Sequence, residues 1–251
     1  MRASFLVFLV VATAALPGLG ATFSANPTAD AFVTAGPAGG LSGNNYGGAG
    51  AVSVSAPGLA QGEQQSVLRF DLAAAPASFD GAFGAGQWSI QSVTLRLVAA
   101  PAGTSIFDAP AAGQLGISWM QDDTWTEGTG TPAAPGSSGI TFTALPTFLG
   151  GGDQSLGSFG FSGATSGSFT YSLALTSGLT GDVFAGDQSS LRLFAADATV
   201  SGVFNSRTFV TPASRPLLTI VAMPEPGSAA LGAVGMLLLA GGRSARRGRS
   251  R

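Results

Sequence analysis

The stretch Trp88-Ser89-Ile90-Gln91-Ser92-Val93-Thr94-Leu95-Arg96-Leu97-Val98-Ala99 decides the fold class of this 251-residue chain. Within it the apolar residues Val93, Leu95 and Leu97 alternate with the polar residues Thr94 and Arg96. Side chains of a β-strand point alternately to its two faces, so this spacing predicts a strand with one face in a core and the other in water.

Similar short segments occur along the rest of the chain. Further strands are predicted at residues 29–33, 52–55, 67–72, 115–119, 140–142, 169–175, 190–196, 203–210 and 217–221. Gly-rich stretches at 36–50 and 149–157 predict a loop and a turn, and a short helical turn is expected at 183–185. About ten short antiparallel strands predict an all-β fold: a single jelly-roll-like β-sandwich over residues 22–222.

Composition excludes several kinds of chemistry. The chain has no Cys, no His and no Lys, so a Ser-His-Asp triad, a His- or Cys-based zinc site and disulfide bonds are all impossible. Residues 22–222 contain twelve acidic residues and five arginines, which gives this body a charge of −7. Nucleic acids are bound through clustered basic residues, so no nucleic-acid partner is expected.

The N-terminus has the three parts of a secretory signal peptide. A basic start at Met1-Arg2 precedes an apolar run at 5–16 and small residues at 17–21. The predicted signal peptide covers residues 1–21, with cleavage after Gly20 or Ala21, and implies export through the Sec translocon. An uncleaved N-terminal membrane anchor is the alternative.

The C-terminus, residues 223–251, has the pattern of a second targeting signal. Pro224-Glu225-Pro226 is followed by an apolar span at 227–242, predicted to be a short transmembrane helix, and then by arginines at 243, 246, 247, 249 and 251. This order resembles the PEP-CTERM sorting signal of Gram-negative bacterial surface proteins. The resemblance implies processing by an exosortase, a membrane protease, and delivery to the cell surface, outer envelope or extracellular matrix. A plain C-terminal membrane anchor is the alternative.

The body also resembles the DNRLRE-type β-sandwich modules, which are related to carbohydrate-binding modules. The matching segments are the Asp30 strand, Asn45-Tyr46-Gly47, Leu68-Arg69-Phe70-Asp71-Leu72, Val93-Thr94-Leu95-Arg96-Leu97, Trp125-Thr126-Glu127-Gly128-Thr129 and Arg215-Pro216-Leu217-Leu218. The usual Ser-Arg-Glu appears as Ser206-Arg207-Thr208, so one acid is missing. The resemblance implies a β-sandwich and a carbohydrate ligand.

One acidic, Trp-containing segment is the candidate ligand site. It contains Trp119, Asp122, Asp123, Trp125 and Glu127. An exposed tryptophan can stack on a sugar ring while carboxylates bind its hydroxyls, which predicts a carbohydrate platform. Two readings stay open beside it: a carboxylate-based polysaccharide-degrading enzyme, and a solvated acidic loop whose tryptophans pack the rim of the sandwich. No catalytic residue is assigned.

A structural Ca²⁺ ion is the one cofactor considered, because a Cys-free exported domain would gain stability from it. Asp30, Asn44 and Asn45 are the first candidate ligands, and Asp122 with Asp123 the second. Alternatively, Asp30 and Asn45 bind turn amides. The chain is thus expected to be an exported, non-catalytic carbohydrate-binding or adhesion module. A structural matrix protein without a ligand, or the enzyme above, is the alternative.

Overall fold

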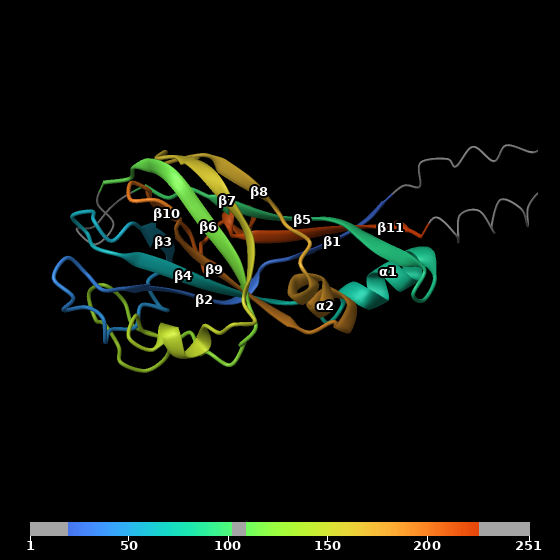
Figure 1. The fold of residues 1–251 in the computed structure, drawn as a ribbon, viewed down its shortest axis with the longest axis horizontal. Coiled ribbons are helices and arrows are strands. Elements are labelled where there is room, and N and C mark those ends of the chain that lie inside the picture. Colours follow the sequence, from blue (N-terminus) through green and yellow to red (C-terminus); the bar gives the residue numbers. More distant parts are fainter. Residues whose placement is uncertain (1–19, 102–108, 226–251) are drawn as a thin grey trace, which may run out of the picture.

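The computed structural model describes residues 20–101 and 109–225, which form two antiparallel β-sheets packed face to face (Figure 1). One sheet has four strands in the order β1 (Ala21–Ala25), β11 (Leu217–Pro224), β5 (Trp88–Val98) and β8 (Ser168–Leu173). The other runs β10 (Ser201–Asn205), β3 (Ala51–Ser55), β4 (Gln64–Asp71), β9 (Gln188–Ala195), β6 (Ala112–Met120) and β7 (Gln154–Ser162), and β2 (Pro27–Thr34) pairs with β4. The predicted all-β sandwich is confirmed.

The main core lies between the two sheets and is built by strand alternation. Val93, Leu95 and Leu97 of β5 are completely buried, as the spacing in this stretch predicts. They belong to the same cluster as Leu68 and Phe70 of β4 in the opposite sheet. Burial of alternating apolar residues from both sheets is the main favourable term in the stability of such a sandwich.

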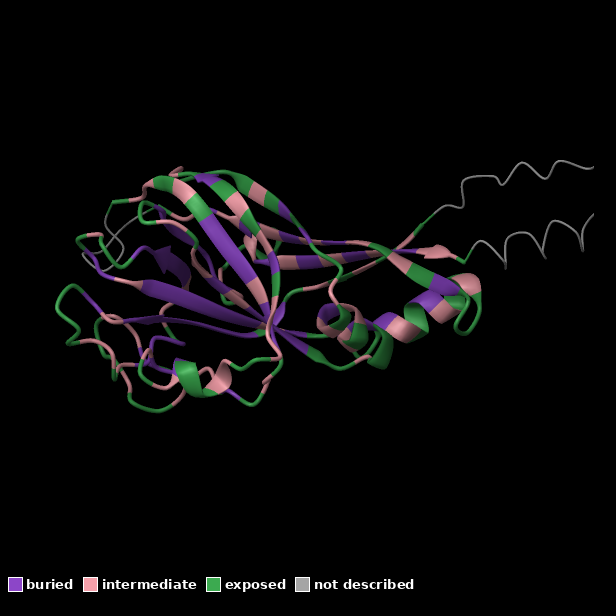
Figure 2. Ribbon diagram, viewed as in Figure 1, coloured by how far each residue is buried: buried purple, intermediate pink, exposed green. Residues whose placement is uncertain are grey.

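A second, smaller core lies on the outer face of the seven-stranded sheet. The long segment between β6 and β7 packs there, and the cluster consists of Ala29, Ala31, Val33, Val67, Met120, Trp125, Ile140 and Leu145. Strands β2 and β4 are therefore covered on both faces and are buried along most of their length (Figure 2). This cover places residues 121–149 in a fixed position against the sheet.

Two α-helices pack against the end of the molecule where β1 and β11 lie side by side (Figure 1). Helix α1 covers Ala75–Phe83, and α2 covers Ser177–Ala185. Two 3₁₀ turns, Leu145–Phe148 and Pro212–Ser214, complete the elements. Only a turn at 183–185 was expected, because two and a half turns of helix are too short for a clear helical period.

The structure corrects two predicted strands and adds two that were not predicted. Residues 140–142 form no strand: Ile140 is buried in the second core while its backbone bonds to Thr126. The strand predicted at 203–210 ends at Asn205. Strands β1 and β7 were not predicted, and β7 occupies part of the expected Gly-rich turn at 149–157. Small residues hide the alternation of β7, because only a few of its side chains are large.

The predicted signal peptide and the predicted C-terminal sorting signal lie mostly outside the described residues. Residues 1–19 of the predicted signal peptide, Pro226, the apolar span and the terminal arginines are among them. Strand β11 runs to Pro224, two residues beyond the expected end of the body at Ala222, because β5 continues to pair with it. No helix within residues 20–101 and 109–225 has the length and apolar character needed to cross a membrane.

Candidate functional site

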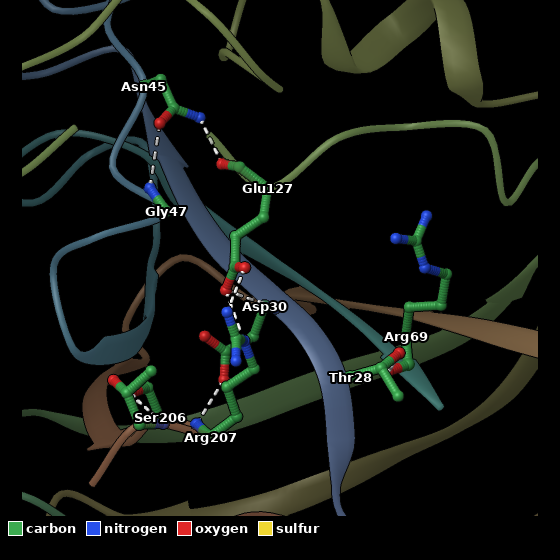
Figure 3. A network of polar contacts seen from close by, with 9 residues as sticks. Thr28, Asp30, Asn45, Gly47, Arg69, Glu127, Ser206 and Arg207 are labelled. Carbon is green, nitrogen blue, oxygen red and sulfur yellow. Dashed lines mark hydrogen bonds and ion pairs between the residues drawn. The ribbon is translucent and has the colours of Figure 1, made fainter. Parts of the chain in front are cut away.

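A polar network that includes Asn45 fixes the base of the 121–149 segment (Figure 3). The Asn45 side-chain NH₂ donates to the carbonyl oxygens of Glu127 and Ile140, each at 2.7 Å. Its Oδ1 accepts from the amides of Gly47 and Gly130, each at 3.1 Å. Both donors and both lone pairs of this fully buried amide are therefore used.

The second part of the network joins three chain segments through charge. The Arg207 guanidinium forms a bidentate ion pair with Glu127, with Nε donating to Oε1 at 2.7 Å. The Arg207 backbone amide donates to Asp30 Oδ2 at 2.6 Å, and the Asp30 amide donates to Glu127 Oε1 at 3.1 Å. Figure 3 shows these groups pointing toward one another beneath Asn45. Strand β2, the long segment and the chain after β10 are thereby connected.

Glycines allow the loops of this network to approach each other. A Cβ atom on Gly47 would lie 2.0 Å from the carbonyl oxygen of Glu127. Gly128 adopts φ +74°, in the left-handed region that L side chains rarely adopt, and a Cβ there would also meet the Asn45 side chain. Steric clashes therefore explain why glycine, and no larger residue, fits at positions 47 and 128.

The predicted calcium ligands Asp30, Asn44 and Asn45 make hydrogen bonds within the chain. Asn45 Oδ1 is occupied by two amides, and the Asn44 NH₂ donates to the Tyr46 hydroxyl at 3.1 Å. The positive charge beside Asp30 comes from Arg207. Within the described ranges, no group of three or more His, Cys, Asp or Glu side chains could hold a metal ion. The alternative reading of Asn45 as a turn-binding residue fits the geometry.

The two tryptophans of the expected sugar platform are buried, which corrects that part of the prediction. Trp125 is 0% exposed; its Nε1 donates to Ser190 Oγ at 2.9 Å, and the Arg69 guanidinium lies 4.9 Å from its ring centroid. Trp119 is 8% exposed and donates to Asp182 Oδ2 of α2 at 2.5 Å. Neither ring offers a free face to a ligand; both pack the sandwich instead.

The acidic residues of the predicted site separate into two places. Glu127 belongs to the Asn45 network, whereas Asp122 and Asp123 line a surface groove of about 580 Å³. Gln121, Asp122, Asp123, Thr124, Thr147, Phe148, Leu149, Gly150 and Asp153 line this groove. We call it the acidic groove. Sequence reasoning missed Phe148 and Asp153, because nothing in the spacing brings them beside residues 121–124.

Each carboxylate of the acidic groove has a distinct environment. Asp122 Oδ1 accepts from the Thr124 hydroxyl at 2.6 Å and from its amide at 2.8 Å, and the pKa of Asp122 is lowered, first by the hydroxyl. Asp153 accepts from the amides of Gln121 and Gly150. Burial raises the pKa of Asp123, whose Oδ1 has no hydrogen-bond partner in the described chain. The groove thus presents carboxylate acceptors beside the apolar side chain of Phe148.

A second hollow of about 410 Å³ continues the acidic groove along the sheet. The two share Leu149, Gly150 and Asp153. Arg192 and Phe194 of β9 line the second hollow, with the guanidinium 4.7 Å from the Phe194 ring centroid. Arg192 Nε donates to Gln65 Oε1 at 2.7 Å. Together the two hollows form an elongated depression rather than a closed pocket.

Burial of the carboxyl groups of Asp30 and Asp182, together with that of Asp123, makes the stability of the fold depend on pH. Desolvation raises the pKa of Asp30 from 3.8 to about 7, and the hydrogen bond from the Arg207 amide offsets only part of this. Desolvation also raises the pKa of Asp182 from 3.8 to about 6. At pH values between the unfolded and the folded pKa, these carboxyl groups are protonated in the folded state and ionised in the unfolded chain. Their contribution to stability is complete below the unfolded pKa and is lost as the pH rises through about 6 to 7.

We therefore expect the thermal midpoint to fall as the pH is raised from about 5 to about 8, with Asp30 contributing on the order of 3 kcal/mol to this loss. Calorimetry across this range measures it. The pKa values of Asp122 and Asp197 are lowered, so those groups titrate below this window. Asp30→Asn should flatten the dependence. A midpoint that rises over the same range would contradict the expectation.

The fold and the site define an all-β sandwich with an open, carboxylate-lined groove beside a loop fixed by polar contacts. No protein-family model and no curated protein matches the sequence. Among solved structures, a chain of "Structure of the Macrobrachium rosenbergii Nodavirus" is similar at 14% identity, with a TM-score of 0.23, over 90% of this chain. The present chain spans 60% of the length of that one. A TM-score this low carries no argument about function.

Proposed function

We propose that this chain is an exported surface protein that acts as a non-catalytic carbohydrate-binding or adhesion module. Its signal peptide directs it through the Sec translocon, and its C-terminal segment is processed by an exosortase. The acidic groove is the observation that carries the binding part. Carboxylates accept hydrogen bonds from sugar hydroxyls, and the side chain of Phe148 offers apolar contact to a sugar ring.

The shape of the depression favours a chain-like ligand. The acidic groove continues into the second hollow through Leu149, Gly150 and Asp153. An open, elongated depression accommodates a polymer that enters at one end and leaves at the other. The loop that carries Asp122 and Asp123 is held by Arg69, which donates to the Asp123 and Trp125 carbonyls at 2.7 and 2.8 Å. Such a pre-formed site loses little conformational entropy on binding.

A binding screen with the full-length protein tests this proposal. Extracellular polysaccharides and their oligosaccharides are titrated by calorimetry, with and without Ca²⁺. Asp122→Asn should weaken binding about tenfold, which corresponds to loss of one charge-assisted hydrogen bond. Asp71→Asn is the matched control, because Asp71 also accepts from a backbone amide two residues on, at Ala73, but lies outside the groove. Absence of binding to every glycan, or equal affinity of the two variants, contradicts the carbohydrate proposal.

The same polysaccharides and variants also test the two alternative functions, an enzyme and a structural protein without a ligand. Reducing sugar released by the unmodified protein, and abolished by Asp122→Asn, would establish the carboxylate-based enzyme instead. The arrangement separates Glu127 from Asp122 and Asp123, because Glu127 is paired with Arg207 and does not line the groove. A blank glycan screen together with a weakened matrix in a deletion strain would support a structural protein without a ligand.

A further inference from the structure

The last strand of the sandwich continues directly into the proposed sorting motif. Met223 and Pro224 are in register with Ser89 and Trp88 of β5. The amide of Glu225 then donates to the carbonyl of Gln87 at 3.0 Å. The first two residues of Pro224-Glu225-Pro226 therefore belong to the folded sheet, with no linker before them.

Pro224 is accommodated in this strand without loss of a sheet hydrogen bond. Strand β1 ends its pairing with β11 at Ala21 opposite Ala222, so one edge of β11 is unpaired beyond that point within the described residues. Successive N–H groups of a strand point to opposite edges. Because the Glu225 amide points to β5, the ring nitrogen of Pro224 faces the unpaired edge, where a missing N–H costs nothing.

The segment of β5 that holds the motif is itself braced by both helices. Trp88 is 4% exposed, and its ring centroid lies 4.9 Å from that of Phe79 in α1 and 4.8 Å from that of Phe184 in α2. Its Nε1 donates to Asp80 Oδ1 at 2.7 Å. The pairing partner of Pro224 is thus fixed by side-chain packing as well as by the sheet.

We infer that the folded body protects the peptide bonds before Glu225, so that processing cuts beyond Glu225 and leaves Met223–Glu225 in place beside β5. This inference rests on the proposed sorting function. An endopeptidase binds its substrate as an extended strand through backbone hydrogen bonds. The Glu225 amide already donates to Gln87, and Pro224 has no N–H to offer from the unpaired edge. The step is hydrolysis of one peptide bond: water supplies a hydroxyl to the new carboxyl group and a proton to the released amine.

Mass spectrometry of the C-terminal peptide of the processed protein tests the position of the cut. The last residue should be Glu225 or a later one. A protein that ends at Ala222, Met223 or Pro224 would overturn the inference while leaving the sorting function intact. If neither the full-length protein nor any variant below is cut, the sorting function fails and the inference fails with it.

Two insertions test whether pairing controls processing. A short Gly-Ser spacer between Ala222 and Met223 frees the motif from β5 and should speed processing several-fold in a pulse-chase experiment. The same spacer between Pro226 and Gly227 adds equal length but leaves the pairing of Met223–Glu225 in place, so its rate should stay close to that of the unmodified chain. Equal acceleration by both spacers would overturn the inference, because distance rather than pairing would then govern the cut.

Hydrogen exchange of the full-length protein gives a readout that is independent of any protease. The Glu225 amide should exchange at least tenfold more slowly than an unstructured amide. Trp88→Ala should abolish this protection, and Trp88→Phe, which keeps an aromatic ring between Phe79 and Phe184, should retain most of it. Unprotected exchange at Glu225 in the unmodified chain would overturn the inference.

Discussion

Replacing Asn45 by aspartate should lower the free energy of unfolding by about 4 kcal/mol, although the two side chains have nearly the same shape. The carboxylate would still accept from the amides of Gly47 and Gly130. It would, however, face the carbonyl oxygens of Glu127 and Ile140 where the NH₂ group now donates. Two buried acceptors would lose their donor, and a buried charge would be added without a counterion.

Thermal and urea unfolding measure this effect, and a decrease in the midpoint of about 10 °C is expected for a body of this size. Asn44→Asp is the matched control. Its NH₂ donates to the Tyr46 hydroxyl at 3.1 Å, so the same substitution one residue earlier should cost less than about 1 kcal/mol. Similar losses for both variants would show that Asn45 has no special role.

Truncating Trp125 to alanine should cost about 4 kcal/mol, the range found for large buried aromatic residues. The ring fills the second core between the sheet and the 121–149 segment, and it is completely buried. Its removal also deletes the hydrogen bond to Ser190 and the surface beneath the Arg69 guanidinium. Because Arg69 holds the Asp123 carbonyl, the acidic groove should lose its shape as well.

Denaturant unfolding gives the stability change, and hydrogen exchange locates it. Amides of residues 121–149 should lose protection first, while those of β5 in the main core remain protected. Trp125→Phe separates packing from hydrogen bonding: it keeps most of the apolar volume and should cost about half as much as alanine. If the alanine variant were within about 1 kcal/mol of the unmodified protein, the second core would contribute little to the fold.

Strand alternation was sufficient to predict the sandwich, and it failed where the same signal is weak. The residues of β5 carry one apolar side chain in every two, so both the strand and its inner face follow directly. In β7, Gly157 and Gly160 interrupt the pattern. The helices were missed because burial of two residues each, such as Phe79 in α1, leaves no helical period to detect.

The candidate site could be predicted only in part. Residues close in sequence, such as Asp122 and Asp123, do line one groove, but their partners Phe148 and Asp153 arrive through the tertiary fold. The tryptophans were interpreted as exposed because an acidic, Gly-rich neighbourhood suggests a surface loop. Sequence alone could not reveal that this segment covers the outer face of the sheet and turns Trp125 inward.

For the residues of the network around Asn45 and Glu127, the sequence offered a motif resemblance rather than strand alternation. Asp30, Asn45, Glu127 and Arg207 lie in the segments that carry the resemblance to DNRLRE-type modules, and all four meet in one place (Figure 3). Their spacing along the chain gives no reason for this meeting. Their contacts with one another and with loop backbone fix the loops of this region.

The antiparallel pairing of β1 with β11 sets the order of events during synthesis. Ala21 near the start of the body pairs with Ala222 near its end, and β11 is the partner that β1 has in its sheet. During synthesis from the N-terminus, this sheet cannot be completed until β11 has been made. Contacts of such long sequence separation form slowly. The four-stranded sheet is therefore expected to close late, once β11 is available to pair with β1.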